Sequence, residues 1–128
     1  MMSPIIPGLN DHEIPELLKA ARNAGAVAAY SQMLRLPLSV APVFMDWLSA
    51  NYPSKADLVE SRIRDSRHGQ LNNAQFHDRM RGQGPYADNI RKTFRVFADK
   101  LGFQDMPPLD TTLFRPPKDR NGQGRLFA

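Results

Sequence analysis

Arginine is the residue type that offers this chain most of its chemistry, and the arginines are concentrated in one stretch. Residues 62–95 carry eight basic and three acidic side chains, whereas residues 1–61 carry four basic and six acidic ones. Seven of those eight are arginine, whose planar guanidinium can hold a phosphate or a carboxylate with two parallel hydrogen bonds. The stretch predicts either a nucleic-acid contact or a solvated helical surface with internal ion pairs. The candidate nucleic-acid contacts are Arg64, Arg67, Arg79, Arg81, Arg91 and Arg95.

Residues that hold metals or act as nucleophiles are scarce. Cysteine is absent, which removes disulfides, zinc–thiolate sites and cysteine nucleophiles together. The three histidines, His12, His68 and His77, lie in different predicted elements and form no His-x-x-x-His pair. Neither a Gly-x-Ser-x-Gly elbow nor a phosphate-binding P-loop occurs. We therefore expect no metal held by this chain and no self-contained hydrolase or kinase activity.

Length and composition set the scale of the fold. A chain of 128 residues, 41% of them apolar, predicts one domain or part of one, with a modest core. No apolar run approaches the 18 or so residues that a membrane-spanning helix needs, and the N-terminus lacks the pattern of a secretory signal. We therefore expect no membrane contact and, by default, a cytoplasmic location.

The first 37 residues are expected to form a strand–helix–strand unit. Residues 3–7 favour a short buried strand, and the turn at residues 8–11 leads into a helix that Asn10 or Asp11 can cap. Gly25 is a natural stop for that helix. Residues 26–36 then favour a second strand, which Pro37 ends. Two strands cannot close a barrel and leave open edges, so a missing partner is implied.

The remainder is expected to be helical up to an extended tail. Apolar spacing predicts helices over residues 40–48, from Ser54 through Ile63, over residues 72–80 and over residues 85–101, the last opened by Pro85. From Gln104 onward the chain is rich in Pro, Asp and Gly and is expected to be extended. The aromatic residues at helical spacing are expected in the core: Phe44, Trp47, Phe94 and Phe97.

A series of short motifs gives the sequence a family resemblance. In order along the chain they are Ser3-Pro-Ile-Ile-Pro-Gly-Leu-Asn-Asp-His-Glu13, Met33-Leu-Arg-Leu-Pro37, Ser61-Arg-Ile-Arg-Asp65, Arg79-Met-Arg-Gly-Gln-Gly-Pro-Tyr86, Leu113-Phe-Arg-Pro-Pro117 and Gln-Gly-Arg-Leu-Phe127. The series resembles the C-terminal third of the radical S-adenosylmethionine (SAM) proteins related to spore photoproduct lyase, in the bacterial branch of unsettled substrate. Arg79 to Tyr86 is the most specific piece.

The resemblance implies a fold, a cofactor and a set of site residues. It implies a mainly α chain with a small β component: a βαβ remnant of a partial (β/α) barrel in residues 1–37, a helical extension in residues 38–103 and a Pro/Gly-rich tail in residues 104–128. The motif positions Ile6, Gly8 and Asp11 match, and Ile6, Gly8 and Asn10 would lie near SAM. Arg35 would face the active-site mouth, with an ion pair at the barrel rim as its alternative role. Helix capping is the alternative role for Asn10 and Asp11.

The resemblance also sets a limit on catalysis. The 4Fe-4S cluster of the family is held by a Cys-x3-Cys-x2-Cys loop, and this chain contains no cysteine. We therefore expect a C-terminal fragment that is not catalytic alone. Its expected partner is a missing N-terminal barrel portion or another copy of itself, and the family's relatives suggest nucleic acid as substrate. Two other hypotheses remain open, a non-catalytic nucleic-acid-binding module and a protein-interaction module.

The last residues carry a separate hypothesis. Gln123, Leu126 and Phe127 resemble the Gln-x-x-Leu-Phe tails by which bacterial proteins dock on the replication sliding clamp. Gly124 stands where such tails prefer an apolar residue, which would weaken docking. A disordered tail, or one packed back on the domain, is the alternative.

Overall fold

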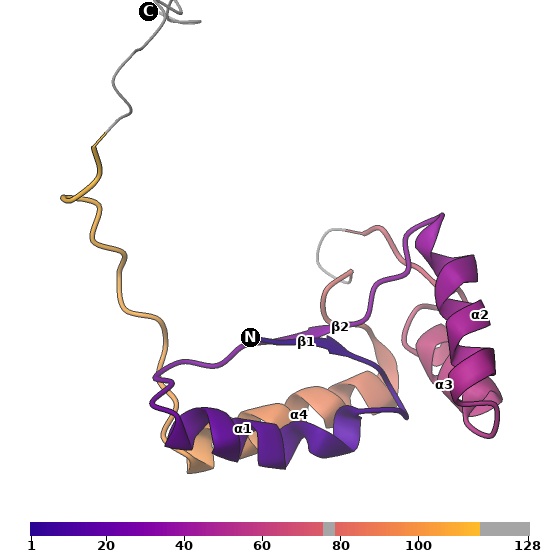
Figure 1. Ribbon diagram of the computed structural model, residues 1–128, viewed down its shortest axis with the longest axis horizontal. Helices are drawn as coiled ribbons and strands as arrows, with labels where there is room; N and C mark the ends of the chain where they lie inside the picture. Colours follow the sequence, from indigo (N-terminus) through magenta and orange to yellow (C-terminus); the bar gives the residue numbers. More distant parts are fainter. Residues whose placement is uncertain (76–78, 116–128) are drawn as a thin grey trace, which may run out of the picture.

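The computed structural model describes residues 1–75 and 79–115, and these form a mainly helical fold with a small two-stranded sheet (Figure 1). This agrees with the coarse fold class expected from the sequence. The elements in chain order are β1 (Met2–Ile5), the 3-10 turn η1 (Asp11–Glu13), α1 (Ile14–Asn23), β2 (Ser31–Met33), α2 (Val40–Asn51), α3 (Ala56–Asp65) and α4 (Gly84–Lys100).

The strand–helix–strand unit is present. Strands β1 and β2 are parallel, with Met2 opposite Ser31 and Ile5 opposite Met33, and α1 connects them. In the described residues the sheet contains only these two strands. Figure 1 shows α1 and α4 side by side under one face of the sheet. The outer edge of β1 is therefore open within the part of the chain that the structure describes.

The second strand is much shorter than the sequence predicted. Of residues 26–36, only Ser31–Met33 is strand, because its partner β1 is itself four residues long. The segment before β2 is bonded instead to the chain that follows α4: the Gln104 N–H donates to the Val27 carbonyl at 2.9 Å. The first strand also ends earlier than expected, at Ile5 rather than Pro7.

Helix α1 ends as predicted but begins differently. Gly25 has φ +91°, and the Gly25 and Ala26 N–H groups donate to the carbonyls of Arg22 and Ala21, which is the Schellman arrangement. At the other end a 3-10 turn precedes α1, and no side chain caps either element. The capping role proposed for Asn10 was wrong, because its side chain turns back to β1.

Two apolar clusters form the core. The first joins the sheet to α1 and α4 through buried residues that include Ile5, Met33, Leu18 and Phe94. The second lies between α2, α3 and the segments after the strands, and its buried residues are Leu9, Leu36, Leu48, Val59 and Ile63. Because α4 packs on α1, residues 1–37 and 38–103 share the first cluster.

Two expectations for the helical part were wrong. The short helix over residues 72–80 does not form in its described residues: residues 72–75 are irregular and residues 79–81 form a turn. Trp47 was expected in the core but is 40% exposed. Phe94 is buried as predicted, and Phe44 and Phe97 are partly buried against the two clusters.

Candidate functional site

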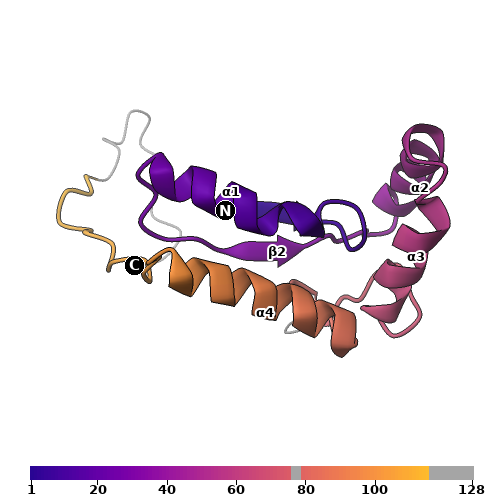
Figure 2. The same ribbon diagram turned by 90° about the horizontal axis from the view of Figure 1, so that it is seen from below.

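The carboxyl ends of both strands point toward α2 and α3, which lie at one end of the molecule (Figures 1 and 2). The turn after β1 is held by Asn10, whose Oδ1 accepts a hydrogen bond from the Ile6 N–H at 2.7 Å and whose Nδ2 donates to the Pro4 carbonyl at 3.2 Å. Gly8 lies inside this turn with φ +80°, a conformation that favours glycine. Ile6, Gly8 and Asn10, which the family resemblance places near SAM, all lie in this one turn.

A polar cluster joins this turn to the start of α4. The Tyr86 hydroxyl donates a hydrogen bond to Asp11 Oδ2. The Arg62 guanidinium carbon of α3 lies 3.9 Å from the centre of the Tyr86 ring, the geometry of a cation–π contact. Gly8 lies beside it: a Cβ there would be 3.7 Å from Arg62 Cγ. We call Gly8, Asp11, Arg62 and Tyr86 the strand-end cluster.

The environment of the cluster shifts the acidity of its tyrosine. Burial raises the pKa of the Tyr86 hydroxyl above its ordinary value, and the hydrogen bond and negative charge of Asp11 raise it further. The Arg62 charge and a backbone hydrogen bond with Gly8 lower that pKa by less. Tyr86 therefore remains protonated at neutral pH and serves as a hydrogen-bond donor.

Two open grooves meet at Tyr86. The groove between α1 and α4 has a volume of ≈ 490 Å³ and is lined by residues that include Gly8, Asp11, His12, Leu58, Tyr86 and Asn89. The groove between α3 and the start of α4 has a volume of ≈ 480 Å³ and includes Arg62, Asp65, Gln83, Tyr86 and Asn89. The first groove is lined by polar side chains such as Asp11 and Asn89 and by apolar ones such as Leu58 and Ile90.

Arg35 follows β2, at the same end of the sheet as Gly8. Its side chain is half-buried, and its Nε is buried without a hydrogen-bond partner among the described residues. No ion pair of Arg35 occurs among the described residues, so the barrel-rim ion pair considered as its alternative role is not seen there.

The arginines of the basic stretch do not form one exposed surface. Arg67 is 2% exposed and donates to the Leu34 carbonyl at 2.8 Å, so it is not available to a phosphate. Arg64 pairs with Glu60 at 2.7 Å. Arg91 donates hydrogen bonds to the Asp88 carboxylate and to the Gly82 carbonyl. The side chain of Arg79 is half-buried. Arg64, Arg81 and Arg95 are exposed, and the Arg95 Nε lies 3.9 Å from Asp99 Oδ2.

The structure explains why glycine occurs at positions 82 and 84 of the Arg79–Tyr86 motif. A Cβ at Gly82 would lie 2.9 Å from Met33 Sδ, and Gly82 also has φ +68°. The Met33 N–H donates to the Met80 carbonyl at 3.1 Å, so this segment runs against β2. Gly84, with φ +84°, then begins α4 and places Tyr86 in its first turn. The motif therefore positions the tyrosine of the strand-end cluster.

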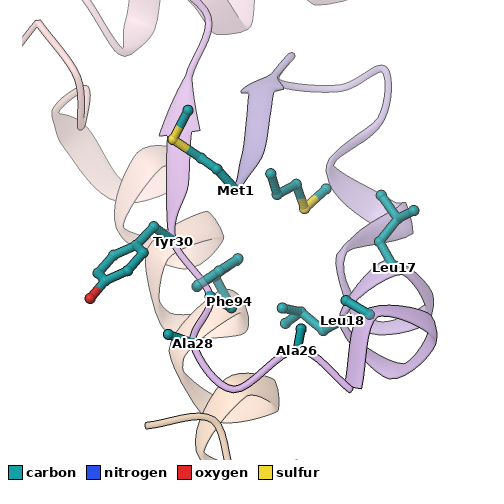
Figure 3. A pocket seen from close by; sticks show the side chains of 10 residues that line it. Met1, Leu17, Leu18, Ala26, Ala28, Tyr30 and Phe94 are labelled. Carbon is teal, nitrogen blue, oxygen red and sulfur yellow. The ribbon is translucent and has the colours of Figure 1, made fainter. Parts of the chain in front are cut away.

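An apolar pocket lies at the opposite end of the sheet. Figure 3 shows Met1, Leu17, Leu18, Ala26, Ala28, Tyr30 and Phe94 around a pocket of ≈ 250 Å³ between α1, α4 and the segment before β2. No ionisable side chain other than Tyr30 lines it. It therefore offers burial but few groups that could orient or activate a ligand.

The described residues contain no group of three side chains that could hold a metal ion, and no described helix is long and apolar enough to cross a membrane. The tail residues Gln123, Leu126 and Phe127 lie outside the described residues.

The comparisons with known proteins found no relative. No protein-family model, no curated protein and no solved structure matches this chain.

Sequence reasoning missed part of this site. Arg62 and Tyr86 were noted only as basic and helical residues, although they lie in the two most arginine-rich motifs. Tyr86 is 75 positions from Asp11, and periodicity carries no information about such a pairing. The one available signal was that Pro85 places Tyr86 at a helix start.

Proposed function

We propose that this chain is the C-terminal part of a radical SAM protein related to spore photoproduct lyase. On this proposal it supplies the last strands of a barrel whose cluster-bearing part is a separate stretch of polypeptide. The observation that carries the proposal is the parallel β1–α1–β2 unit with a left-handed glycine turn at the carboxyl end of β1. Barrel enzymes place their sites at this end of their strands.

The incomplete sheet supports the need for another polypeptide. Parallel sheets are almost always covered on both faces, and two strands alone are marginally stable in water. Here α1 and α4 cover one face, and the N–H groups of β1 that point away from β2 have no strand beside them in the described residues (Figure 1). A neighbouring parallel strand would satisfy those groups.

The residues of this chain suit SAM, one cofactor of the family, but not the 4Fe-4S cluster, the other. The chain has no cysteine, so it cannot ligate the iron–sulfur cluster, and that group belongs to the partner polypeptide on this proposal. The ≈ 490 Å³ groove beside Gly8 has room for a nucleoside-sized ligand, and its lining offers Asp11 and Asn89 as polar contacts. The cluster supplies the radical chemistry in such proteins.

The role of this chain is then to bind and orient. Asn10 holds the Gly8 turn, and Tyr86 and Arg62 fix α4 and α3 against it. The Tyr86 proton stays on the hydroxyl oxygen, which donates it in a hydrogen bond to Asp11 Oδ2. That hydrogen bond stabilises the negative charge of the Asp11 carboxylate. These contacts keep one wall of the groove rigid.

The test begins with the reading frame upstream of the Met1 codon, which should encode Cys-x3-Cys-x2-Cys. Coexpression of that product with this chain should give a complex that contains iron and sulfide, whereas this chain purified alone should contain neither. Absence of such a frame, or failure of the two products to copurify, would overturn the proposal.

A matched pair of variants sharpens the coexpression test. Ser3 lies in β1 next to Met2, and the Met2 N–H donates to the carbonyl of Tyr30, the residue before β2. Successive N–H groups of a strand point to opposite sides, so the Ser3 N–H points to the open edge. Ser3→Pro removes that N–H and should weaken copurification, while Ser3→Ala keeps it and should not. Circular dichroism of both variants controls for folding.

Nucleic acid is the substrate class that the exposed arginines favour. Arg81 and Arg95 are exposed, and so is Arg64, which pairs with Glu60, whereas Arg67 is buried. If the chain contacts phosphates through them, each alanine substitution should reduce the slope of log affinity against log salt by about 0.9. Binding that does not depend on salt would exclude this contact.

A further inference from the structure

The outer surface of α2 carries an apolar stripe that is separate from the strand-end cluster. Val40, Val43, Trp47 and Ala50 are all exposed, and they recur at intervals of three, four and three residues. Val43 is 68% exposed and Trp47 40%. Such alternating intervals place the four side chains in one row along the helix, the spacing of a helix–helix seam.

The stripe is not a by-product of loose packing of α2. Leu48 is completely buried against α3, so α2 already has an inner face, and the stripe lies outside it. Trp47 is held in place: its ring centre lies 5.7 Å from that of Phe44 and 5.5 Å from that of Tyr52. A helix that is apolar on its outer as well as its inner side is expected to be covered on both.

We infer that the stripe is a dimer seam, on which α2 of a second copy of this chain packs antiparallel. The first argument is charge. None of the four side chains is charged, and the acidic Asp46 lies at the edge of the row. A surface without charge is complementary to itself, as a twofold interface requires, whereas it offers nothing to a phosphate backbone or a charged peptide.

The second argument is that the row is complementary to a second copy of itself running in the opposite direction. The row is symmetric about residue 45, so antiparallel packing places Val43 opposite Trp47 of the second copy and Val40 opposite Ala50. At the outer positions a valine meets an alanine, and at the inner positions the Trp47 ring meets a valine, so neither pair sets two bulky side chains against each other. The antiparallel arrangement also brings opposite ends of the two helix dipoles together.

The third argument is position. Figures 1 and 2 show α2 at one end of the molecule, while the open edge of β1 lies along its middle. A second copy on α2 and another polypeptide on β1 therefore use different parts of the chain. The inference does not rest on the proposed function and would survive its failure.

The test is the oligomeric state of the full chain by analytical ultracentrifugation over a range of concentrations. The wild-type chain should show a concentration-dependent dimer. Val43→Glu places a charge in the centre of the seam and should weaken the dimer by at least about tenfold. Because Val43 is largely exposed, the substitution should leave the folded state intact.

A matched control is available at Leu38, which is 92% exposed and lies outside the row. Leu38→Glu adds the same charge and removes a similar apolar side chain, and it should leave the dimer unchanged. Asp46→Asn removes the like charges that flank the seam and should tighten the dimer slightly.

Two results would overturn the inference. One is a wild-type chain that stays monomeric at every concentration up to its solubility limit. The other is an equal effect of Val43→Glu and Leu38→Glu, which would show that the dimer does not use this row. If Val43→Glu instead prevents copurification with a cluster-bearing polypeptide and does not change self-association, the stripe belongs to that polypeptide and the dimer seam is wrong.

Discussion

The two ends of the small sheet have different chemistry. At the amino ends of the strands, the pocket around Phe94 is lined by apolar side chains and Tyr30. At the carboxyl ends, Asp11, Tyr86 and Arg62 come from three different elements and form a hydrogen bond and a cation–π contact. The difference indicates that the amino ends of the strands stabilise the fold by burying apolar side chains, whereas their carboxyl ends hold polar groups in place beside a groove. A ligand site is therefore expected at the carboxyl end.

The largest predicted effect is at the amino end. Phe94 is buried in the cluster that joins the sheet to α1 and α4. Phe94→Ala should lower the free energy of unfolding by about 3–5 kcal/mol, because it adds a cavity next to an existing pocket. Urea denaturation measures it. An effect below about 1 kcal/mol would show that the pocket collapses and that this end is not a fixed part of the core.

A smaller loss is expected where the Arg79–Tyr86 motif crosses β2. Gly82→Ala should lower the free energy of unfolding by about 1–3 kcal/mol, since the new Cβ would meet Met33 Sδ in addition to backbone strain. Gly25→Ala is the matched control, because Gly25 has a similar positive φ with no heavy atom near its missing Cβ. Equal losses in the two variants would mean that the Met33 contact costs nothing.

Removal of the Tyr86 hydroxyl should have a modest effect on stability. Tyr86→Phe should lower the free energy of unfolding by about 1 kcal/mol, since one hydrogen bond to Asp11 is lost. The same substitution at Tyr52, whose hydroxyl lies outside the cluster, should change it less. If the carboxyl end is the functional end, Tyr86→Phe should reduce the activity of an assembled complex more than Phe94→Ala does, at equal folded fraction.

The raised pKa of Tyr86 predicts a dependence on pH. As pH rises past about 10, the unfolded chain loses the tyrosine proton before the folded chain does, so the unfolded state gains relative stability. The contribution of Tyr86 is therefore complete below pH 10 and falls as pH rises toward the folded-state pKa. The difference in unfolding free energy between wild type and Tyr86→Phe should shrink over this range, and a difference independent of pH would contradict it.

The smallest effect is expected from the cation–π contact. Arg62→Gln should lower the free energy of unfolding by about 0.5–1 kcal/mol, because the guanidinium over the Tyr86 ring is replaced by a neutral amide. The loss should largely disappear in a Tyr86→Leu background. An unchanged loss in that background would assign the effect of Arg62 to other contacts.

The parts of the fold that the sequence predicted correctly are those with local signals. Pro85 and Gly102 correctly bounded α4 to within a residue, and Gly25 correctly ended α1. These signals act within one helical turn, where missing N–H groups and positive φ values decide the boundary. The parallel β1–α1–β2 order also followed from local patterns.

The parts that could not be predicted depend on contacts distant in sequence. Strand β2 has only three residues because β1 is short and because the Val27 carbonyl accepts its hydrogen bond from the Gln104 N–H instead of from a strand. Trp47 has the helical spacing of a core residue, yet it is 40% exposed. The pairing of Asp11 with Tyr86 joins the first turn to the last helix. No periodicity within a window of the sequence encodes such contacts.

The central claim is that β1 receives a strand of another polypeptide beside the strand-end cluster. The most direct measurement is hydrogen–deuterium exchange of this chain, alone and after coexpression with the product of the upstream frame. The claim predicts that the Ser3 amide exchanges rapidly in the isolated chain and becomes protected in the complex, together with amides of the Gly8 turn. A complex in which the Ser3 amide exchanges as fast as in the isolated chain would contradict it.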